Sequence, residues 1–340
     1  MRERFVAACF ALALLSLPAA GADFTLKGKT VTIYIAGGAG GGVDAYARTF
    51  APYLARYLPG EPTIISANMP GGGGAQAVQY LYNIAPRDGT AIGTTNAGPV
   101  SEPQLGGMKA NYDIGKFRWV GSLAKGNTVC AAWHTTSFKT IEDVRAREMI
   151  IASTGATSAP ARTAWLMNTV IGTKMKPVSG YTGGTALLAI ERGEVDGTCT
   201  TLNSLLSTRP QWIRDGQLRL LFFVAMKQDK GYEQVPLALN EIKSADDRLA
   251  LEFYLLPYEF NNPLILPPDV SDDILNAYRQ AFERAVADRE YLIEAEKRGQ
   301  PVGAESGRRV SEYVERMLTM PQSIIDRTKS AIDPVKGERR

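Results

Sequence analysis

Histidine and cysteine are scarce in this 340-residue chain, which contains one histidine and three cysteines. His134 lies four residues after Cys130, and this pair falls short of the four ligands that hold a structural zinc ion. One histidine also leaves a Ser-His-Asp arrangement with a single candidate base, and the sequence contains no Gly-x-Ser-x-Gly motif. We therefore expect neither a metal site nor catalytic residues, and no cofactor.

An excess of charge of one sign is also missing. The chain has 38 Lys and Arg against 35 Asp and Glu, a formal net charge of +3. The first 22 residues carry two Arg and one Glu, so that without them the net charge is +2. Such a small bias, spread along the chain, does not favour a nucleic-acid partner.

Beyond the N-terminus, no segment approaches the roughly 20 apolar residues of a membrane helix. The first 22 residues have the layout of a secretory signal, with Arg2 and Arg4, an apolar run at 5–17 and a small-residue site at 20–22. We therefore expect an exported, periplasmic protein whose mature chain begins near Asp23.

The cysteines leave two interpretations open. Cys9 would be removed with the signal and lies too early in the apolar run to carry a lipid. In an oxidising compartment, Cys130 and Cys199 could form one disulfide, or they could be two small buried thiols. The sequence does not place them in contact.

The remaining 318 residues suggest two domains, at about 150 residues each. The composition, 45% hydrophobic and 21% charged, is typical of globular proteins. Between Thr30 and Ala225, strand-like stretches alternate with helix-like ones, which predicts an α/β fold with parallel sheets built from βαβ units. We expect one lobe at 23–124 plus 226–340 and the other at 125–225.

The periodicity predicts individual elements. Strands are expected at 31–35, 63–65, 128–133, 149–153, 177–180, 195–200, 218–224 and 263–266. Helices are expected at 44–56, 75–84, 140–147, 161–171, 185–192, 205–215, 271–287 and 306–320. Pro210 interrupts the sixth of these helices, so its limits are the least defined.

Two glycine runs, at 36–43 and 70–75, follow predicted strands and precede predicted helices. Such a turn presents backbone N–H groups at a helix N-terminus, where anions bind. The runs also fit the relaxed dinucleotide pattern Gly-x-Gly-x-x-Ala at Gly40 and Gly72. Neither is followed by the acidic residue expected at the end of the next strand, and neither ends in Gly-Lys-Ser/Thr, so we favour a carboxylate ligand over a nucleotide.

Six segments of the chain resemble, in the same order, motifs of the substrate-binding proteins of tripartite tricarboxylate transporters, also called the Bug family. The segments are Ile33–Arg48, Asn68–Gly74, Pro86–Thr90, Ala152–Ser158, Gly180–Gly184 and Gly193–Gly197. The departures are Met69 for an Arg, Thr157 for a Gly, and the absence of a Pro before the first Gly-Gly pair.

The resemblance implies a type II periplasmic-binding-protein fold, in which two α/β lobes close on a ligand. It implies a monomer that binds a small di-, tri- or aromatic carboxylate and delivers it to the membrane subunits of the transporter. The expected ligand-binding residues are Ala39, Gly40, Gly41, Gly42, Val43, Asp44, Gly72, Gly73, Gly74, Ala75, Ser153, Gly155, Thr157, Ser158, Tyr181 and Thr200. The alternatives are an exported enzyme acting on a small carboxylate and a sensor for a membrane receptor.

Several side chains have two possible roles. Asp44 and Ser158 could each cap a helix or touch the ligand. Arg162 could form a fork with a carboxylate or lie solvated on its helix, and Tyr181 could line the cleft or pack in the core. Arg48 is expected in a structural ion pair.

The segment 198–203 provides hydroxyls and an amide but no negative charge. An ammonium buried there without a counter-charge would be costly. We therefore expect a ligand without an α-ammonium group.

Overall fold

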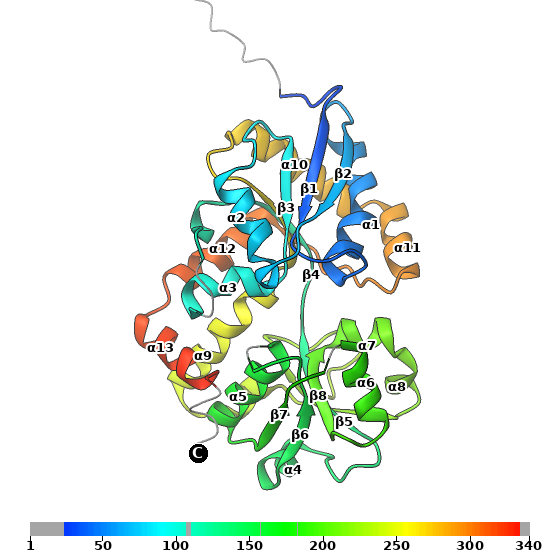
Figure 1. The fold of residues 1–340 in the computed structure, drawn as a ribbon, viewed down its shortest axis with the longest axis vertical. Coiled ribbons are helices and arrows are strands. Elements are labelled where there is room, and N and C mark those ends of the chain that lie inside the picture. The colour runs from blue at the N-terminus through cyan, green and yellow to red at the C-terminus, as the bar shows by residue number, and fades with distance from the viewer. Residues whose placement is uncertain (1–23, 107–109, 157, 182, 334–340) are drawn as a thin grey trace, which may run out of the picture.

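The structure is a computed structural model that describes residues 24–106, 110–156, 158–181 and 183–333. The expected export signal at 1–22 and Thr157 lie outside these residues. Figure 1 shows two α/β lobes stacked along the long axis, each built around its own sheet. Within the described ranges, no helix is both long and apolar enough to cross a bilayer. The expected two-lobed α/β architecture is confirmed.

The first lobe contains a six-stranded sheet. In spatial order its strands are β11 (Glu305–Ser306), β4 (Arg118–Ala124), β10 (Asn261–Leu266), β3 (Ala91–Thr94), β1 (Thr30–Ile35) and β2 (Thr63–Asn68). Its helices are α1 (Gly42–Tyr57), α2 (Ala75–Asn83), α3 (Ala97–Leu105), α10 (Asp272–Val286), α11 (Arg289–Lys297) and α12 (Gly307–Leu318), with short 3-10 turns η1 (Gly72–Gly74) and η2 (Ile114–Lys116).

Alternating burial along β1 explains how this lobe packs. Val31, Ile33 and Ile35 are fully buried, as expected for a strand with one apolar face against a helical layer. From α1 and α10, Phe50 and Phe282 meet edge to face on that side, with ring centroids 5.6 Å apart. The apolar stripes of both helices therefore anchor them to the sheet and hold the N-terminus of α1 at the end of β1.

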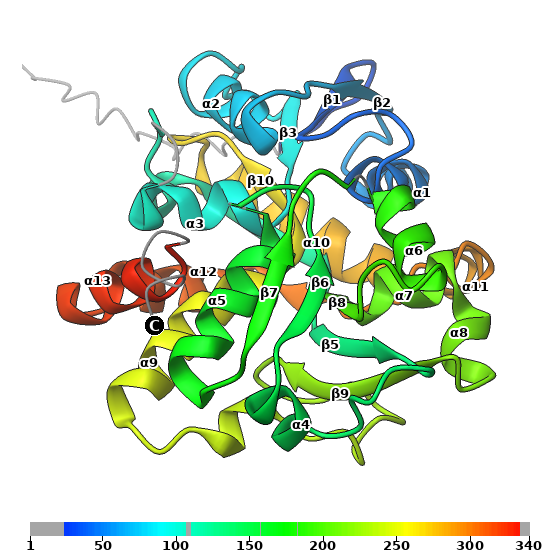
Figure 2. The ribbon, with the colours of Figure 1, turned by 60° about the horizontal axis from the view of Figure 1, so that its bottom comes forward.

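The second lobe contains a five-stranded sheet, whose neighbouring strands Figure 2 shows from below. In spatial order they are β7 (Met175–Val178), β6 (Met149–Ala152), β8 (Gly197–Thr201), β5 (Thr128–Trp133) and β9 (Leu218–Val224). Its helices are α4 (Ile141–Ala146), α5 (Ala159–Ile171), α6 (Gly183–Glu191), α7 (Leu202–Thr208) and α8 (Pro210–Arg214).

The chain crosses from the first sheet to the second at residues 125–127, between β4 and β5. This crossing is fastened to a second one, because Gly126 N–H donates to the Tyr258 carbonyl at 2.8 Å. Tyr258 ends the 3-10 turn η4 (Leu256–Tyr258), shortly before β10 returns to the first sheet. Two adjacent connections of this kind form a natural hinge.

After β9 the chain first stays with the second sheet. Phe223 N–H donates to the Pro236 carbonyl at 2.7 Å, and the 3-10 turn η3 (Ala238–Glu241) packs on β9 and α5. The lobe limits at 23–124 plus 226–340 and 125–225 remain a proposal, and these contacts favour placing the second crossing nearer to β10.

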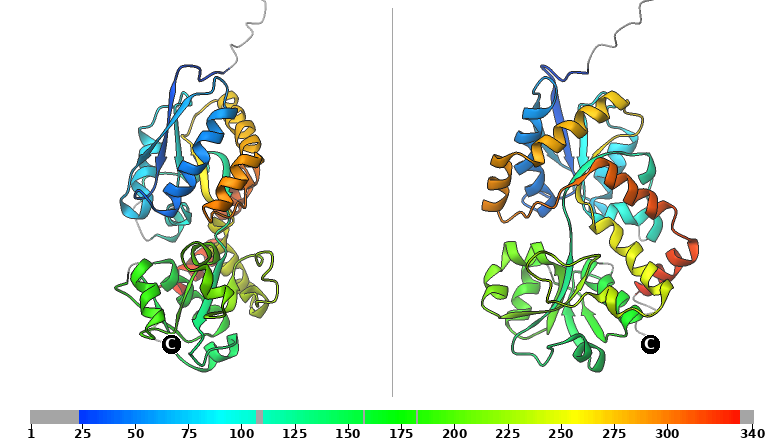
Figure 3. Two further views of the ribbon diagram at one scale, coloured as in Figure 1. Left: turned by 90° about the vertical axis from the view of Figure 1, so that its right-hand side faces the viewer. Right: turned by 180° about the vertical axis from the view of Figure 1, so that it is seen from behind.

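Two helices connect the lobes along one side, α9 (Ala245–Leu255) and α13 (Gln322–Ala331). They pack on each other, and α13 also contacts α3 of the first lobe and α5 of the second. Figure 3, seen from behind, shows both helices beside the gap between the two sheets. At this side, therefore, the lobes meet through a packed helical layer.

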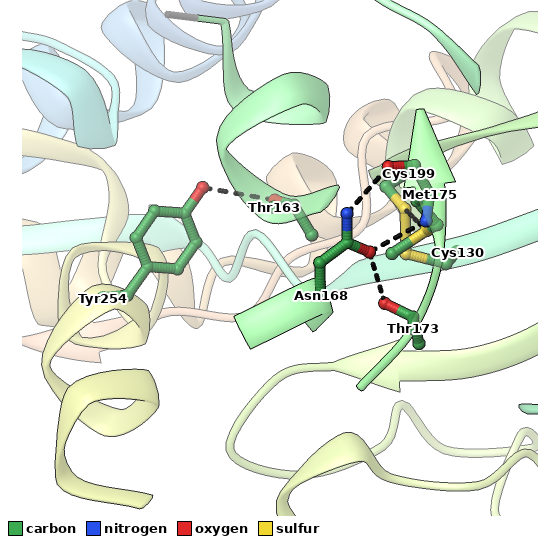
Figure 4. The surroundings of a disulfide bond; sticks show 7 residues. All are labelled: Cys130, Thr163, Asn168, Thr173, Met175, Cys199 and Tyr254. Carbon is green, nitrogen blue, oxygen red and sulfur yellow. Dashed lines mark hydrogen bonds between the residues drawn. A yellow bond between two sulfur atoms is a disulfide. The ribbon is translucent and has the colours of Figure 1, made fainter. Parts of the chain in front are cut away.

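Cys130 and Cys199 form a disulfide between the neighbouring strands β5 and β8, so the open question about these cysteines has an answer. Both are almost fully buried. Figure 4 shows the bridge beside Met175, whose backbone N–H and carbonyl are both hydrogen-bonded to Asn168 at 2.8 Å. The bridge ties the centre of the second sheet together.

Two predictions about the fold are wrong in detail. Both sheets are mixed, because β10 is antiparallel to β3 and β4, and β5 is antiparallel to β8 and β9. Hydrophobic periodicity reports which faces are buried and carries no strand direction. The helix expected at 205–215 is two helices, since Pro210 has no N–H to donate and begins α8.

Candidate functional site

Three helices of the first lobe begin at one edge of the sheet. The strands β1, β2 and β3 are parallel, so their carboxyl ends lie together, and α1, α2 and α3 each start just after one of them. Helix N-termini carry unpaired N–H groups and a partial positive charge. This edge, which faces the second lobe, is therefore a favourable place for an anion.

The first glycine turn is held in shape by Asp44, whose side chain is 5% exposed. Its carboxylate accepts hydrogen bonds from Gly40 N–H at 2.9 Å, Asn68 Nδ2 at 2.8 Å and Arg48 Nε at 2.8 Å. Burial acts to raise the pKa of Asp44, but these hydrogen bonds outweigh it and leave the pKa below its ordinary value. Asp44 therefore braces the turn from beneath, and the expected ion pair of Arg48 is confirmed.

We expect Asp44→Asn to lower the free energy of unfolding by about 1–3 kcal/mol at pH 7, because an amide cannot accept from all three donors. Since the folded-state pKa is depressed, the carboxylate stabilises the fold above its unfolded pKa of about 3.9, and this contribution is lost as the pH falls through the folded value. Urea unfolding of the wild-type protein and the variant at pH 7 and in acid measures the difference between their free energies of unfolding. This difference should be smaller in acid.

Asp88→Asn is the matched control, because Asp88 makes its ion pair with Lys29 on the surface, where its side chain is 54% exposed. A change of no more than about 1 kcal/mol is expected there. Equal decreases in the free energy of unfolding of the Asp44→Asn and Asp88→Asn variants would contradict the bracing role of Asp44.

The second glycine turn depends on backbone conformations that other residues rarely adopt. Residues Gly71 to Gly74 all have positive φ, from 54° to 133°. A Cβ at Gly74 would also lie 3.0 Å from the carbonyl oxygen of Ala36, so the two turns approach each other closely. Only glycine allows this turn to deliver α2 to the same edge as α1.

The second lobe contributes two helix starts, α5 after β6 and α7 after β8. Thr201 caps α7, and its Oγ1 accepts from Ser204 N–H at 3.3 Å. Ser158 precedes α5 but makes no side-chain cap, and its buried Oγ has no hydrogen-bond partner among the residues that the structure describes. Ser158 therefore keeps a hydroxyl that is free to meet a ligand.

Two adjoining cavities lie between the lobes. The α3–α5 cavity, about 660 Å³, is lined by Gly73, Glu102, Ser158 and Arg162 among others. The α1–α7 cavity, about 510 Å³, is lined by residues that include Gly40, Gly42, Val43 and Lys125. Asn96, Thr201 and Asn261 line both, so the cavities are neighbouring parts of one cleft.

Five of the expected site residues line this cleft: Gly40, Gly42, Val43, Gly73 and Ser158. Six others belong to the same turns without lining it, namely Ala39, Gly41, Gly72, Gly74, Ala75 and Gly155. Their part in binding stays a prediction.

The other described members of the expected set are turned elsewhere. Asp44 is occupied beneath its turn, and the Ser153 hydroxyl lies 3.3 Å from the Val178 carbonyl. Tyr181 packs against the core of the second lobe. Thr200 precedes the cleft-lining Thr201 in β8, and successive strand residues point to opposite faces.

Several cleft residues are not among those expected from the sequence. Asn96 caps α3 by accepting from Gly98 N–H at 3.1 Å, and its Asn-Ala-Gly context could have indicated a helix start. Glu102, Tyr254 and Asn261 reach the cleft from α3, α9 and β10. Only the fold brings these positions together.

The cations that line the cleft are already paired. Lys125 Nζ lies 3.2 Å from Glu259 and 2.9 Å from Glu305. Burial acts to lower the pKa of Lys125, but these two carboxylates raise it above its usual range. Arg162 pairs with Glu102 across the cleft at 2.8 Å. It therefore takes neither of the two roles expected for it, a fork with a ligand carboxylate or a solvated position on its helix. Backbone amides thus remain the main groups available to an anion.

Fold and cleft together correspond to the two-lobed type II periplasmic-binding-protein fold. The structure is similar to a TctC solute-binding protein from Polaromonas solved without ligand (TM-score 0.70, 16% identity, 88% of this chain and 98% of that one). It is also similar to MatC from Rhodopseudomonas palustris with bound malate (TM-score 0.63, 20% identity, 89% of this chain and 98% of that one). A further similar structure is an R. palustris protein with adipate (TM-score 0.62, 18% identity, 89% of this chain and 95% of that one).

The chain is similar as well to the periplasmic binding protein BugD (TM-score 0.64, 16% identity, 89% of this chain and 98% of that one), and the names TctC and BugD agree with the resemblance seen in the sequence. At such identities the likeness establishes the fold. No protein-family model and no curated protein matches the chain.

Proposed function

We propose that this chain is a periplasmic solute-binding protein that captures a small di-, tri- or aromatic carboxylate for a tripartite tricarboxylate-type transporter. The observation that carries the proposal is the pattern of helix caps. Of the helices that begin at the cleft, α3 and α7 are capped by Asn96 and Thr201, whereas α1, α2 and α5 have no side-chain cap. At α1 and α5 the first N–H groups are the natural partners of a carboxylate, whereas the first two of α2, those of Ala75 and Gln76, already donate to the carbonyls of Gly72 and Gly71.

Helices that begin elsewhere are mostly capped. Side chains of Thr140, Ser244, Ser271, Asp288 and Ser306 cap α4, α9, α10, α11 and α12. Two others without a side-chain cap, α8 and α13, have proline at the first helical position or at the N-cap. The uncapped starts of α1 in the first lobe and α5 in the second therefore leave N–H donors for a ligand on both sides of the cleft.

The neighbouring solved structures support the class of ligand, since one holds malate and another adipate. Delivery to membrane subunits and a monomeric state are part of the proposal and rest on the family resemblance. The exported location rests on the layout of the first 22 residues.

The test is calorimetric titration of the purified mature protein with a panel of di-, tri- and aromatic carboxylates. Saturable 1:1 binding of at least one acid, recovered unchanged after dialysis, is expected. Chemical conversion of the bound acid would support an enzyme instead. A panel in which no carboxylate binds would contradict the proposed function.

A further inference from the structure

Glu102 is a buried acid that lines the α3–α5 cavity, and the proposed carboxylate-binding function does not use it. It lies on α3 of the first lobe, and its side chain is 5% exposed. One oxygen, Oε1, accepts a hydrogen bond from Arg162 Nη1 of α5 at 2.8 Å. This pair joins the two lobes across the α3–α5 cavity.

The second oxygen of Glu102 has no partner. Oε2 is buried, and no hydrogen-bond donor in the described part of the chain reaches it. A buried carboxylate oxygen without a donor is unfavourable, because its hydrogen bonds to water are lost on burial and no hydrogen bond within the protein replaces them. Since Glu102 lines the cavity, the missing donor can come from a molecule bound there.

Ser158 repeats the pattern from the other lobe. Its Oγ is also buried and has no hydrogen-bond partner within the described ranges, and Ser158 lines the same cavity. A carboxylate oxygen accepts only, whereas a hydroxyl both donates and accepts. The two groups together suit a ligand group that donates to Glu102 and exchanges a hydrogen bond with Ser158.

We propose that Glu102 Oε2 accepts a hydrogen bond from a hydroxyl of the ligand, so that the protein prefers hydroxycarboxylates to their keto or unsubstituted counterparts. This inference rests on the proposed function and narrows its substrate class. The carboxylate of the ligand binds at the helix N-termini, and the neighbouring hydroxyl donates a hydrogen bond to Glu102.

A hydroxyl fits this acceptor better than an ammonium does. The charge of Glu102 is already balanced by Arg162. An ammonium would enter without a net counter-charge, which is costly. A ligand without an α-ammonium group therefore stays a prediction, and the acid that lines the cleft is Glu102 of α3, outside the segment 198–203.

Pairs of acids that differ only at the 2-position provide the test. Calorimetry would compare lactate with pyruvate, malate with oxaloacetate, 2-hydroxyglutarate with 2-oxoglutarate, and mandelate with phenylglyoxylate. In each skeleton that binds, the hydroxy acid should bind roughly tenfold to hundredfold more tightly, because a ketone places a second acceptor against Glu102. The amino acid of the same skeleton should bind more weakly than the hydroxy acid.

Glu102→Gln changes the acceptor into a donor. Its amide oxygen must face Arg162, which can only donate, so its NH₂ group faces the cavity. The preference for hydroxy over keto acid should fall at least tenfold or reverse. A purely structural role would weaken both acids equally and leave their ratio unchanged.

The outcomes separate the two proposals. Equal affinities of the wild-type protein for hydroxy and keto acids would overturn the role of Glu102, and a water would then be the partner of Oε2. That result would leave the proposed carboxylate binding intact. Tightest binding of the amino acid would also overturn it. Binding of no acid at all would contradict the proposed function itself. The wild-type comparison needs no variant, so it decides even if Glu102→Gln folds poorly.

Discussion

Replacing Gly42 with Asp should remove carboxylate binding while leaving the fold intact. Gly42 is the first residue of α1 and lines the cleft, and a Cβ there would meet no atom within 4 Å. Two unit charges about 4 Å apart repel by about 4 kcal/mol near a protein surface. We expect the affinity for the best-binding carboxylate to fall by roughly a hundredfold or more.

Two further variants at the same position separate charge from size. Gly42→Asn has nearly the shape of the Asp variant without its charge, and Gly42→Ala adds only a methyl group. An acidic residue in the first helical turn is favourable, so the Asp variant should be as stable as wild type by thermal melting. Equal affinities of the Asp and Asn variants in calorimetry would show that no anion binds at the start of α1.

The glycine turns illustrate what the sequence can predict. A run of glycine between a strand-like and a helix-like segment has few structural explanations, because glycine avoids regular elements unless close approach or positive φ requires it. Both turns lie where they were expected, at the carboxyl ends of β1 and β2. Here local chemistry and fold agree, so the edge of the first lobe at which the ligand is proposed to bind was predictable.

The second lobe was less predictable at the level of side chains. Thr200 and Thr201 differ by one position in β8, yet they point to opposite faces, and Thr201 is the one that lines the cleft. Sequence motifs locate a strand end to within a residue or two. In a strand, an error of one residue assigns a side chain to the wrong face of the sheet. Glu102 was missed for another reason, because α3 has little apolar periodicity and follows a short strand that was not expected.

The disulfide lies beyond sequence reasoning as well, since 69 positions separate Cys130 from Cys199 and nothing local pairs them. Their contact requires β5 to lie antiparallel to β8, whereas the alternation of strands and helices suggested parallel sheets. An exported protein is the setting in which such a bridge forms and persists. Its contribution to stability can be measured directly.

We expect the Cys130→Ala/Cys199→Ala double variant to lose about 4 kcal/mol of unfolding free energy, because the bridge closes a long loop and restricts the unfolded chain. Urea unfolding followed by tryptophan fluorescence suits this test, since Trp133, Trp165 and Trp212 lie in the second lobe and Trp119 alone in the first.

A reductant provides the matched control for this last experiment. Dithiothreitol should move the urea midpoint of the wild-type protein most of the way to that of the double variant, and it should leave the double variant unchanged. Alanine keeps both buried positions apolar, so the loss of packing is small compared with the loss of the cross-link. Coincident unfolding curves for the oxidised wild type and the double variant would contradict a stabilising bridge at the centre of the second sheet.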